Sequence, residues 1–264
     1  MDKKQHLIDI ISRLDSIAVA FSGGVDSSFL LAVCHEVLGD KVLAITADAA
    51  IHLDWEIALA KKFTTNQNIR HILFHPAIME QPEFIINNQE RCYICKKFLF
   101  QELKIIATKN SIKYIVHGAN KDDLEDFRPG FKAASELGVL APLITAGFSK
   151  AEIREEAKKM GLDCWDRPAM ACLATRIPYG TSISYEALKI IEQAETVLYK
   201  MGVKSCRVRH HGNIARVEID PAIFPQIIEN QNREIIINKL KALGYRYVTL
   251  DLDGYTQGSL NRAL

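Results

Sequence analysis

The stretch IAVAFSGGVDSS, residues 17–28, decides the fold of this chain. Its apolar half predicts a buried strand, and apolar residues recur at helical spacing over residues 29–37. The turn between them, Ser22 to Ser27, contains two glycines that let the backbone approach a ligand closely. Free N–H groups and the positive end of the helix dipole favour an anion there. We therefore expect this turn to hold a phosphate or pyrophosphate.

The glycine turn lacks the Lys-Ser/Thr ending of a Walker A motif. The sequence S-G-G-V-D-S instead resembles the PP-loop of the N-type ATP pyrophosphatases. That resemblance implies cleavage of ATP between its α and β phosphates and adenylation of a substrate, and it assigns the pyrophosphate to Ser22, Gly23, Gly24, Asp26 and Ser27. The alternative is an ordinary strand-to-helix turn that an Asp or Ser side chain caps.

Composition narrows the class of protein. A chain of 264 residues that is 48% hydrophobic can build a large core in one or two domains. Its 33 basic and 32 acidic residues balance, so bulk charge favours neither nucleic acid nor an anionic membrane as a partner. No apolar run approaches the roughly 20 residues of a membrane span, and the N-terminus predicts an amphipathic helix rather than a signal peptide. We expect a cytoplasmic protein with reduced cysteines.

The first part of the chain alternates strand and helix patterns, which predicts an α/β fold with a parallel sheet and helices on both faces. Ser149 and Glu152 form a predicted capping box at one helix start. Ligands of such sheets bind beyond the carboxyl ends of the strands, where the glycine turn, Asp48, His75 and Gly118 are expected. The predicted strands cover residues 17–21, 41–47, 70–74 and 113–117, and the predicted helices cover 54–66, 96–109 and 150–160.

The pattern changes after Pro168, and we place a domain boundary near residue 180. Residues 1–180 are the predicted PP-loop ATP pyrophosphatase domain. Residues 181–264 are a predicted small α+β domain, ordered α-β-β-α-β, for substrate binding and oligomerisation. Its predicted helices cover 185–200 and 235–243, and its strands cover 205–210, 213–220 and 245–252.

Three cysteines are candidates for chemistry. Cys92 and Cys95 form a C-x-x-C at a helix start, where thiols have lowered pKa values and favour metal binding or redox work. With Cys172, three thiolates could hold a [4Fe-4S] cluster that leaves one iron open, or zinc together with another ligand. Cys164 is a rival for the third position. The alternative for the C-x-x-C is a pair of cysteines packed at a helix end.

Polar residues after the strand at 113–117 suit nucleotide binding. Gly118 and Asn120 are expected beside ATP, and Asp123 is a candidate ligand for Mg²⁺ on the ATP phosphates, with Asp26 as the other candidate. Arg128 either neutralises a phosphate or braces its loop. The alternative is a solvated turn.

The predicted hairpin of the second domain places Arg207 and Arg209 on one face, where two guanidinium groups can grip a phosphate. Glu218 lies on one face of the second strand, opposite Val217. Glu195 lies at the margin of the apolar face of a helix. The alternative is an ordinary solvent-exposed face of a sheet.

Five segments together resemble the LarE family nearly end to end: S-G-G-V-D-S, R-C-Y-I-C-K-K, G-A-N-K-D-D with D-F-R-P-G, A-C-L-A-T-R-I-P-Y-G, and the segment 251–261. LarE enzymes are ATP-dependent sulfur transferases of nickel-pincer nucleotide synthesis, which makes the cofactor of lactate racemase. The resemblance implies that ATP adenylates a carboxylate of pyridinium-3,5-biscarboxylic acid mononucleotide. Sulfide or another sulfur donor then converts it to a thiocarboxylate. Members form homo-oligomers.

The family has two sources of sulfur. In one, a single cysteine gives up its own sulfur and becomes dehydroalanine; in the other, three cysteines hold a [4Fe-4S] cluster that carries an added sulfide. This chain resembles the second type, so ATP, Mg²⁺ and a [4Fe-4S] cluster are the implied cofactors. The residues that the resemblance assigns are Cys92, Cys95 and Cys172 to the cluster, Arg207 and Arg209 to the substrate phosphate, and Glu195 and Glu218 to a metal patch that Gln226 leaves incomplete.

Two other functions compete with this interpretation. A tRNA thiolation enzyme of the PP-loop class also joins the loop to distant cysteines, but it should carry a basic surface for RNA. A non-catalytic sensor of adenine nucleotides could use the same fold without the three thiols.

Overall fold

The computed structural model describes residues 2–124, 130–168 and 171–256. The chain forms two compact units. The first comprises Met1–Glu80 and Gln89–Met170, and the second comprises Gln81–Asn88 and Ala171–Leu264. The functions that the sequence assigns to the two predicted domains stay predictions.

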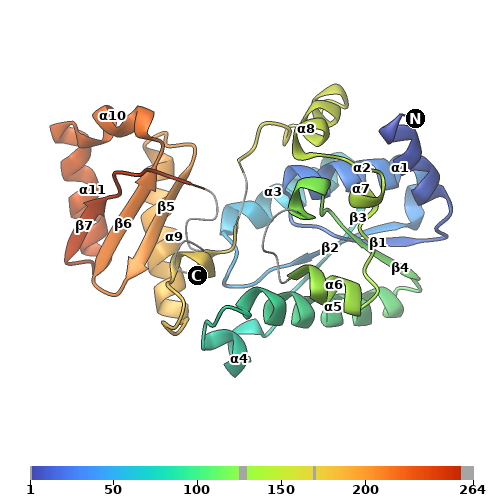
Figure 1. Ribbon diagram of the computed structural model, residues 1–264, viewed down its shortest axis with the longest axis horizontal. Coiled ribbons are helices and arrows are strands. Elements are labelled where there is room, and N and C mark those ends of the chain that lie inside the picture. Colours follow the sequence, from blue (N-terminus) through green and yellow to red (C-terminus); the bar gives the residue numbers. More distant parts are fainter. Residues whose placement is uncertain (1, 125–129, 169–170, 257–264) are drawn as a thin grey trace. The chain divides into compact units, whose positions relative to one another are not determined.

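The first unit contains a four-stranded parallel sheet in the order β3-β2-β1-β4 (Figure 1). The expected α/β architecture is therefore confirmed. β1 lies in the centre, and the chain crosses from one side of it to the other between β3 and β4. The carboxyl end of β1 is thus a topological switch point, where ligands of such sheets bind. The strands are β1 (Ile17–Ala20), β2 (Val42–Ala47), β3 (Arg70–Phe74) and β4 (Tyr114–His117).

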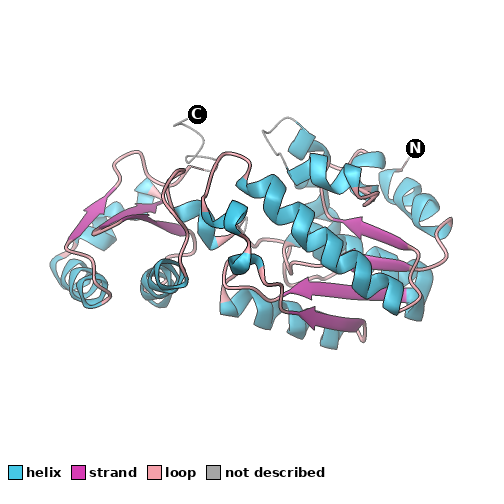
Figure 2. Ribbon diagram, turned by 90° about the horizontal axis from the view of Figure 1, so that it is seen from below, coloured by secondary structure: helices cyan, strands magenta, loops and turns pink. Residues whose placement is uncertain are grey.

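Helices cover both faces of this sheet (Figure 2). Ile17 and Val19 point into one core, whereas Ala18 points into the other, as the alternation of a strand requires. Among the described residues, no helix is long and apolar enough to cross a membrane. The first core is covered by α1 (Lys3–Ser12), α2 (Val25–Leu38), α3 (Asp54–Asn66), α7 (Pro142–Thr145) and α8 (Lys150–Lys159), and the second by α5 (Arg91–Lys109) and α6 (Gly130–Glu136).

Local signals predict several boundaries well. Helix α3 and strand β3 cover the predicted residues, and the predicted capping box of Ser149 and Glu152 starts α8. Helix α5 begins at Arg91 rather than at residue 96, so the C-x-x-C lies in its first turns. The sequence misses the short helices α6 and α7, which contain too few residues for a clear period.

The second unit contains a three-stranded sheet in the order β5-β6-β7. β5 and β6 are antiparallel, and β6 and β7 are parallel, so the predicted α-β-β-α-β order is confirmed. Val208 and Val217 pack with the helices on one face of the sheet. The elements are α9 (Tyr185–Lys200), β5 (Cys206–His211), β6 (Ile214–Ile219), α10 (Phe224–Ile228), α11 (Asn230–Ala242) and β7 (Tyr247–Leu250).

A short segment from the first half of the sequence joins this second unit. It contains α4 (Pro82–Ile85) and the fully buried Asn87. Asn87 Nδ2 donates to the carbonyl oxygens of Pro178 and Thr181, at 2.8 Å each. Its φ of 58° lies in the left-handed region, which asparagine tolerates better than most residues. The segment therefore braces the loop that follows Cys172, and nothing in the sequence pattern predicted it.

Candidate active site

The glycine turn is folded around the first turn of α2. Gly23 has a φ of 76°, which favours glycine. Ser27 Oγ accepts a hydrogen bond from the Ser22 amide at 3.3 Å and donates to the Gly24 carbonyl at 3.1 Å. Gly24 is the N-cap of α2 and supplies no side-chain cap. The turn thus presents backbone amides and two serine hydroxyls at a helix N-terminus, as a phosphate cradle requires.

Strand β4 meets this turn by direct backbone contact. A Cβ atom added to Gly118 would lie 2.7 Å from the Ser27 nitrogen and 2.9 Å from the Ser27 Cα. The structure therefore brings Gly118 to the glycine turn at the switch point of the sheet. At the ends of β2 and β3, the Asp48 carboxylate lies 3.7 Å from His75 Nδ1.

Asp26 is the centre of a polar cluster in the first unit. Its Oδ1 accepts from Asn120 Nδ2 at 3.3 Å, and its Oδ2 is paired with Lys150 Nζ. The structure thus brings the predicted residues Asp26 and Asn120 together and adds Lys150, which sequence reasoning missed. Lys150 is the first residue of α8, where a positive charge opposes the helix dipole. A lysine at this unfavourable position is a sequence feature that could have identified Lys150 as a functional candidate.

Asp123, the other candidate Mg²⁺ ligand, lies in a more buried environment than Asp26. It is buried, and its Oδ2 accepts from the Asn120 amide at 2.9 Å. The Asp26 side chain is partly exposed and lies at the glycine turn, so of the two candidates it is the more accessible to Mg²⁺. Arg128 lies outside the described residues.

A second cation lies beside the glycine turn. Arg167 Nη1 donates to the Gly23 carbonyl at 3.3 Å. Arg154 holds the same loop by donating to the carbonyl oxygens of Trp165 and Arg167, at 2.7 and 2.5 Å. The sequence did not predict Arg167, because it follows helix α8 in an irregular stretch without periodicity.

The candidate cysteines belong to both units. Cys92 and Cys95 lie in the first turns of α5 in the first unit, and the half-buried Cys172 lies in the second unit, immediately before the short helix η4 (Leu173–Arg176). Cys164 packs in the first core, and burial raises the pKa of its thiol, which disfavours the thiolate that a metal needs. In the ranges that the structure describes, no three His, Cys, Asp or Glu side chains form a metal-binding group.

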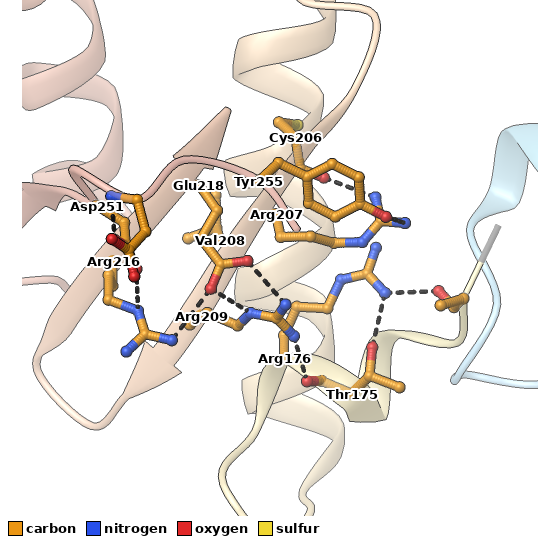
Figure 3. Close-up of polar contacts among 12 residues, drawn as sticks. Thr175, Arg176, Cys206, Arg207, Val208, Arg209, Arg216, Glu218, Asp251 and Tyr255 are labelled. Carbon is orange, nitrogen blue, oxygen red and sulfur yellow. Dashed lines mark hydrogen bonds and ion pairs between the residues drawn. The ribbon is translucent and has the colours of Figure 1, made fainter. Parts of the chain in front are cut away.

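Arg207, Arg209 and Glu218 of the second sheet are buried rather than exposed to solvent, whereas Arg216 beside them is partly exposed. Arg209 donates from Nε and Nη2 to the two oxygens of Glu218, at 2.9 and 2.7 Å, and Arg216 Nη2 adds a bond at 3.0 Å (Figure 3). Burial raises the pKa of Glu218, but the two arginines outweigh it and lower that pKa overall. Arg207 stacks on Tyr255, 4.9 Å from the ring centre, and donates to its hydroxyl at 3.3 Å. The alternative that Arg207, Arg209 and Glu218 lie on an ordinary solvent-exposed face of a sheet is therefore excluded.

Glu195 is fully buried and does not lie at the margin of the apolar face of its helix, where the sequence predicts it. Its Oε1 accepts from Arg176 Nε at 2.8 Å and from the Val208 amide at 3.0 Å, and its Oε2 accepts from Arg176 Nη2 at 2.9 Å. The oxygens of Glu195 and Glu218 thus already accept N–H groups, most of them from guanidinium groups. This geometry does not fit the expected metal patch.

Two known proteins are similar to this chain over almost its whole length. It is 37% identical to an uncharacterised protein of Synechocystis sp. over 99% of this chain and 98% of that protein. It is 33% identical to the pyridinium-3,5-bisthiocarboxylic acid mononucleotide synthase of Lactiplantibacillus plantarum, over 99% of this chain and 95% of the synthase. A shorter match of 23% identity covers 54% of this chain and 50% of a glutamine-hydrolysing GMP synthase component of Archaeoglobus fulgidus. No family model matches.

Proposed function

Because the chain belongs to the LarE family of pyridinium-3,5-bisthiocarboxylic acid mononucleotide synthases, we propose that it is an ATP-dependent sulfur transferase. Its substrate is pyridinium-3,5-biscarboxylic acid mononucleotide, and its product is a thiocarboxylate. The observation that carries this proposal is the glycine turn at the switch point of the sheet, which has the Lys150 and Arg167 cations beside it.

The chemistry has two steps. A substrate carboxylate oxygen attacks the α-phosphorus of ATP, the bond from that phosphorus to the β-phosphate oxygen breaks, and pyrophosphate leaves. A sulfur atom at the oxidation level of sulfide then attacks the acyl carbon, and the C–O bond to AMP breaks. Nothing is oxidised or reduced. Adenylation is needed because a carboxylate oxygen is a poor leaving group and AMP is a good one.

Residues of the first unit serve the first step. The backbone of Gly23 and Gly24 and the hydroxyls of Ser22 and Ser27 hold the pyrophosphate, while Lys150 and Arg167 offset its charge. Asp26 would hold the Mg²⁺ that ATP carries, and that ion would supply charge neutralisation at the phosphates.

The second step needs sulfur and a fixed substrate. Cys92, Cys95 and Cys172 would hold a [4Fe-4S] cluster, whose open iron would supply the sulfide. Arg207 is the residue we assign to the substrate phosphate, with Arg209 two residues along on the same face of β5. Because the Arg209 guanidinium already bonds Glu218 and the Thr175 carbonyl, Arg209 would reach the phosphate only by giving up one of these bonds. We expect a cytoplasmic homo-oligomer, as the family resemblance implies.

A direct assay tests the function. Reduced protein incubated without oxygen with ATP, the pyridinium dicarboxylate mononucleotide and sulfide should release one pyrophosphate and one AMP for each thiocarboxylate formed. Mass spectrometry measures the thiocarboxylate, and an enzyme-coupled assay measures pyrophosphate. ATP binding without pyrophosphate release would instead indicate a nucleotide sensor. Pyrophosphate release that depends on tRNA would indicate a tRNA thiolation enzyme.

Lys150→Met should weaken the use of ATP. Lys150 offsets negative charge at the cradle, and its replacement removes that positive charge, so the KM for ATP should rise by about 10-fold or more. Initial rates of pyrophosphate release measure it. Lys159→Met is the matched control, because Lys159 is on the same helix but pairs with Glu155 and Glu156 at the surface. Equal effects of the two changes would contradict this assignment.

A further inference from the structure

We propose that Arg176 and Glu195 position Cys172 for sulfur transfer. This inference rests on the proposed function, because it concerns the cysteine to which that function assigns the sulfur chemistry. Arg176 is 1% exposed and Glu195 is 0% exposed, and both belong to the second unit together with Cys172.

One nitrogen of the Arg176 guanidinium donates hydrogen bonds to the backbone of the turn that contains Cys172. Its Nη1 donates to the carbonyl oxygens of Ala171 and Cys172, at 2.5 and 3.0 Å, and to Thr175 Oγ1 at 3.0 Å. Thr175 Oγ1 in turn donates to the Cys172 carbonyl at 2.8 Å. The Thr175 amide adds a bond to the same oxygen at 3.0 Å, so the Cys172 carbonyl accepts three hydrogen bonds. They fix the peptide plane next to the Cα from which the thiol projects.

The other side of the same guanidinium is held by an ion pair with Glu195. Arg176 Nε and Nη2 form a two-pronged pair with the Glu195 carboxylate, at 2.8 and 2.9 Å. Glu195 is on α9, and its Oε1 also accepts from the Val208 amide of β5. Because the guanidinium is planar, Arg176 links the turn at Cys172 rigidly to Glu195 of α9, which is itself bonded to the backbone of β5.

A second guanidinium holds the same turn in the same way. Arg209 Nη1 donates to the Thr175 carbonyl at 2.7 Å, while its Nε and Nη2 are paired with Glu218 (Figure 3). A buried ion pair contributes little net stability compared with well-packed apolar side chains. Two such pairs on one short turn are better explained by the geometry that they impose. This assignment also gives Glu195 and Glu218 a role without a metal.

The experiment compares Arg176→Lys with Arg216→Lys. Both changes keep a positive charge and remove an arginine–carboxylate contact of the second unit, but Arg216 bonds Glu218 and Asp251 rather than the turn. In Arg176→Lys, thiocarboxylate formation should fall by about 10- to 100-fold, because a small displacement of a reacting group has that effect. Pyrophosphate release should stay within about twofold of the wild type. Arg216→Lys should change neither rate by more than about twofold.

A second readout reports the thiol itself. The rate at which iodoacetamide alkylates Cys172 in the full chain, followed by peptide mass spectrometry before iron is added, should change by about fivefold or more in Arg176→Lys and not in Arg216→Lys. Should Arg176→Lys fail to fold, Thr175→Val provides the test. It removes the hydroxyl that donates to the Cys172 carbonyl and accepts from Arg176 Nη1. It leaves both ion pairs and the Thr175 amide bond to that carbonyl in place, and it should lower thiocarboxylate formation by about 3- to 10-fold.

The proposal is overturned if pyrophosphate release and thiocarboxylate formation fall in parallel, or if Arg176→Lys and Arg216→Lys behave alike. A wild-type protein that forms no thiocarboxylate would overturn the proposed function instead. The alkylation rates would still decide whether Arg176 positions Cys172.

Discussion

Cys172→Ala should reduce thiocarboxylate formation by at least about 1,000-fold while ATP continues to be cleaved to AMP and pyrophosphate. In the proposed function, Cys172 takes part in sulfur delivery whether it is a cluster ligand or the donor of its own sulfur. The proposed cradle for pyrophosphate, in contrast, lies entirely in the first unit, at Ser22, Gly23 and Lys150. The two steps should therefore separate in this variant. Pyrophosphate and thiocarboxylate are measured in the same reaction.

Cys164→Ala is the control for this experiment and also tests the rival ligand. Cys164 is buried in the core of the first unit, so its replacement should leave sulfur transfer intact. Retained transfer in Cys172→Ala together with loss in Cys164→Ala would reverse the assignment.

Two further variants separate the two sources of sulfur. If a cluster delivers it, Cys92→Ala and Cys95→Ala should lose both iron–sulfur absorbance and repeated turnover. If Cys172 gives up its own sulfur, both variants should still complete one turnover, and the chain should lose one H₂S in mass.

Local sequence signals predicted the parts of the fold that depend on neighbouring residues. The glycine turn, the capping box of α8 and the alternation of β5 are each visible within about ten residues. The cations of the site are different, because their partners are distant in sequence. Lys150 and Asp26 are 124 residues apart, and Arg167 and Gly23 are 144 residues apart. Such pairs leave no periodic signal, so only the folded chain identifies them.

Glu195 illustrates the same limit at one residue. Helical spacing places it at the margin of an apolar face, which predicts partial exposure. The structure buries it fully, because Arg176 and the Val208 amide satisfy its oxygens. A carboxylate can be buried when its charge is paired and hydrogen-bonded. That condition depends on a residue outside the helix and cannot be derived from the helix alone.

Gly118→Ala should destabilise the first unit by about 1–3 kcal/mol and sharply reduce pyrophosphate release. The added Cβ would lie 2.7 Å from the Ser27 nitrogen, 2.9 Å from its Cα and 3.0 Å from the Asp26 carbonyl carbon. All three atoms are backbone, so no side-chain rotation relieves the clash and the first turn of α2 must move. That movement displaces the amides and the Ser27 hydroxyl that form the cradle. Urea unfolding and pyrophosphate release at saturating ATP measure the two effects.

Gly130→Ala supplies the matched control for this steric argument. Its added Cβ would lie 2.9 Å from Lys96 Cγ, which belongs to a flexible side chain that can rotate away. The same change in composition should therefore cost little stability there and leave ATP cleavage intact. If Gly118→Ala proves as stable and active as Gly130→Ala, strand β4 does not support the glycine turn by close backbone contact. The switch point would then hold ATP through the turn alone.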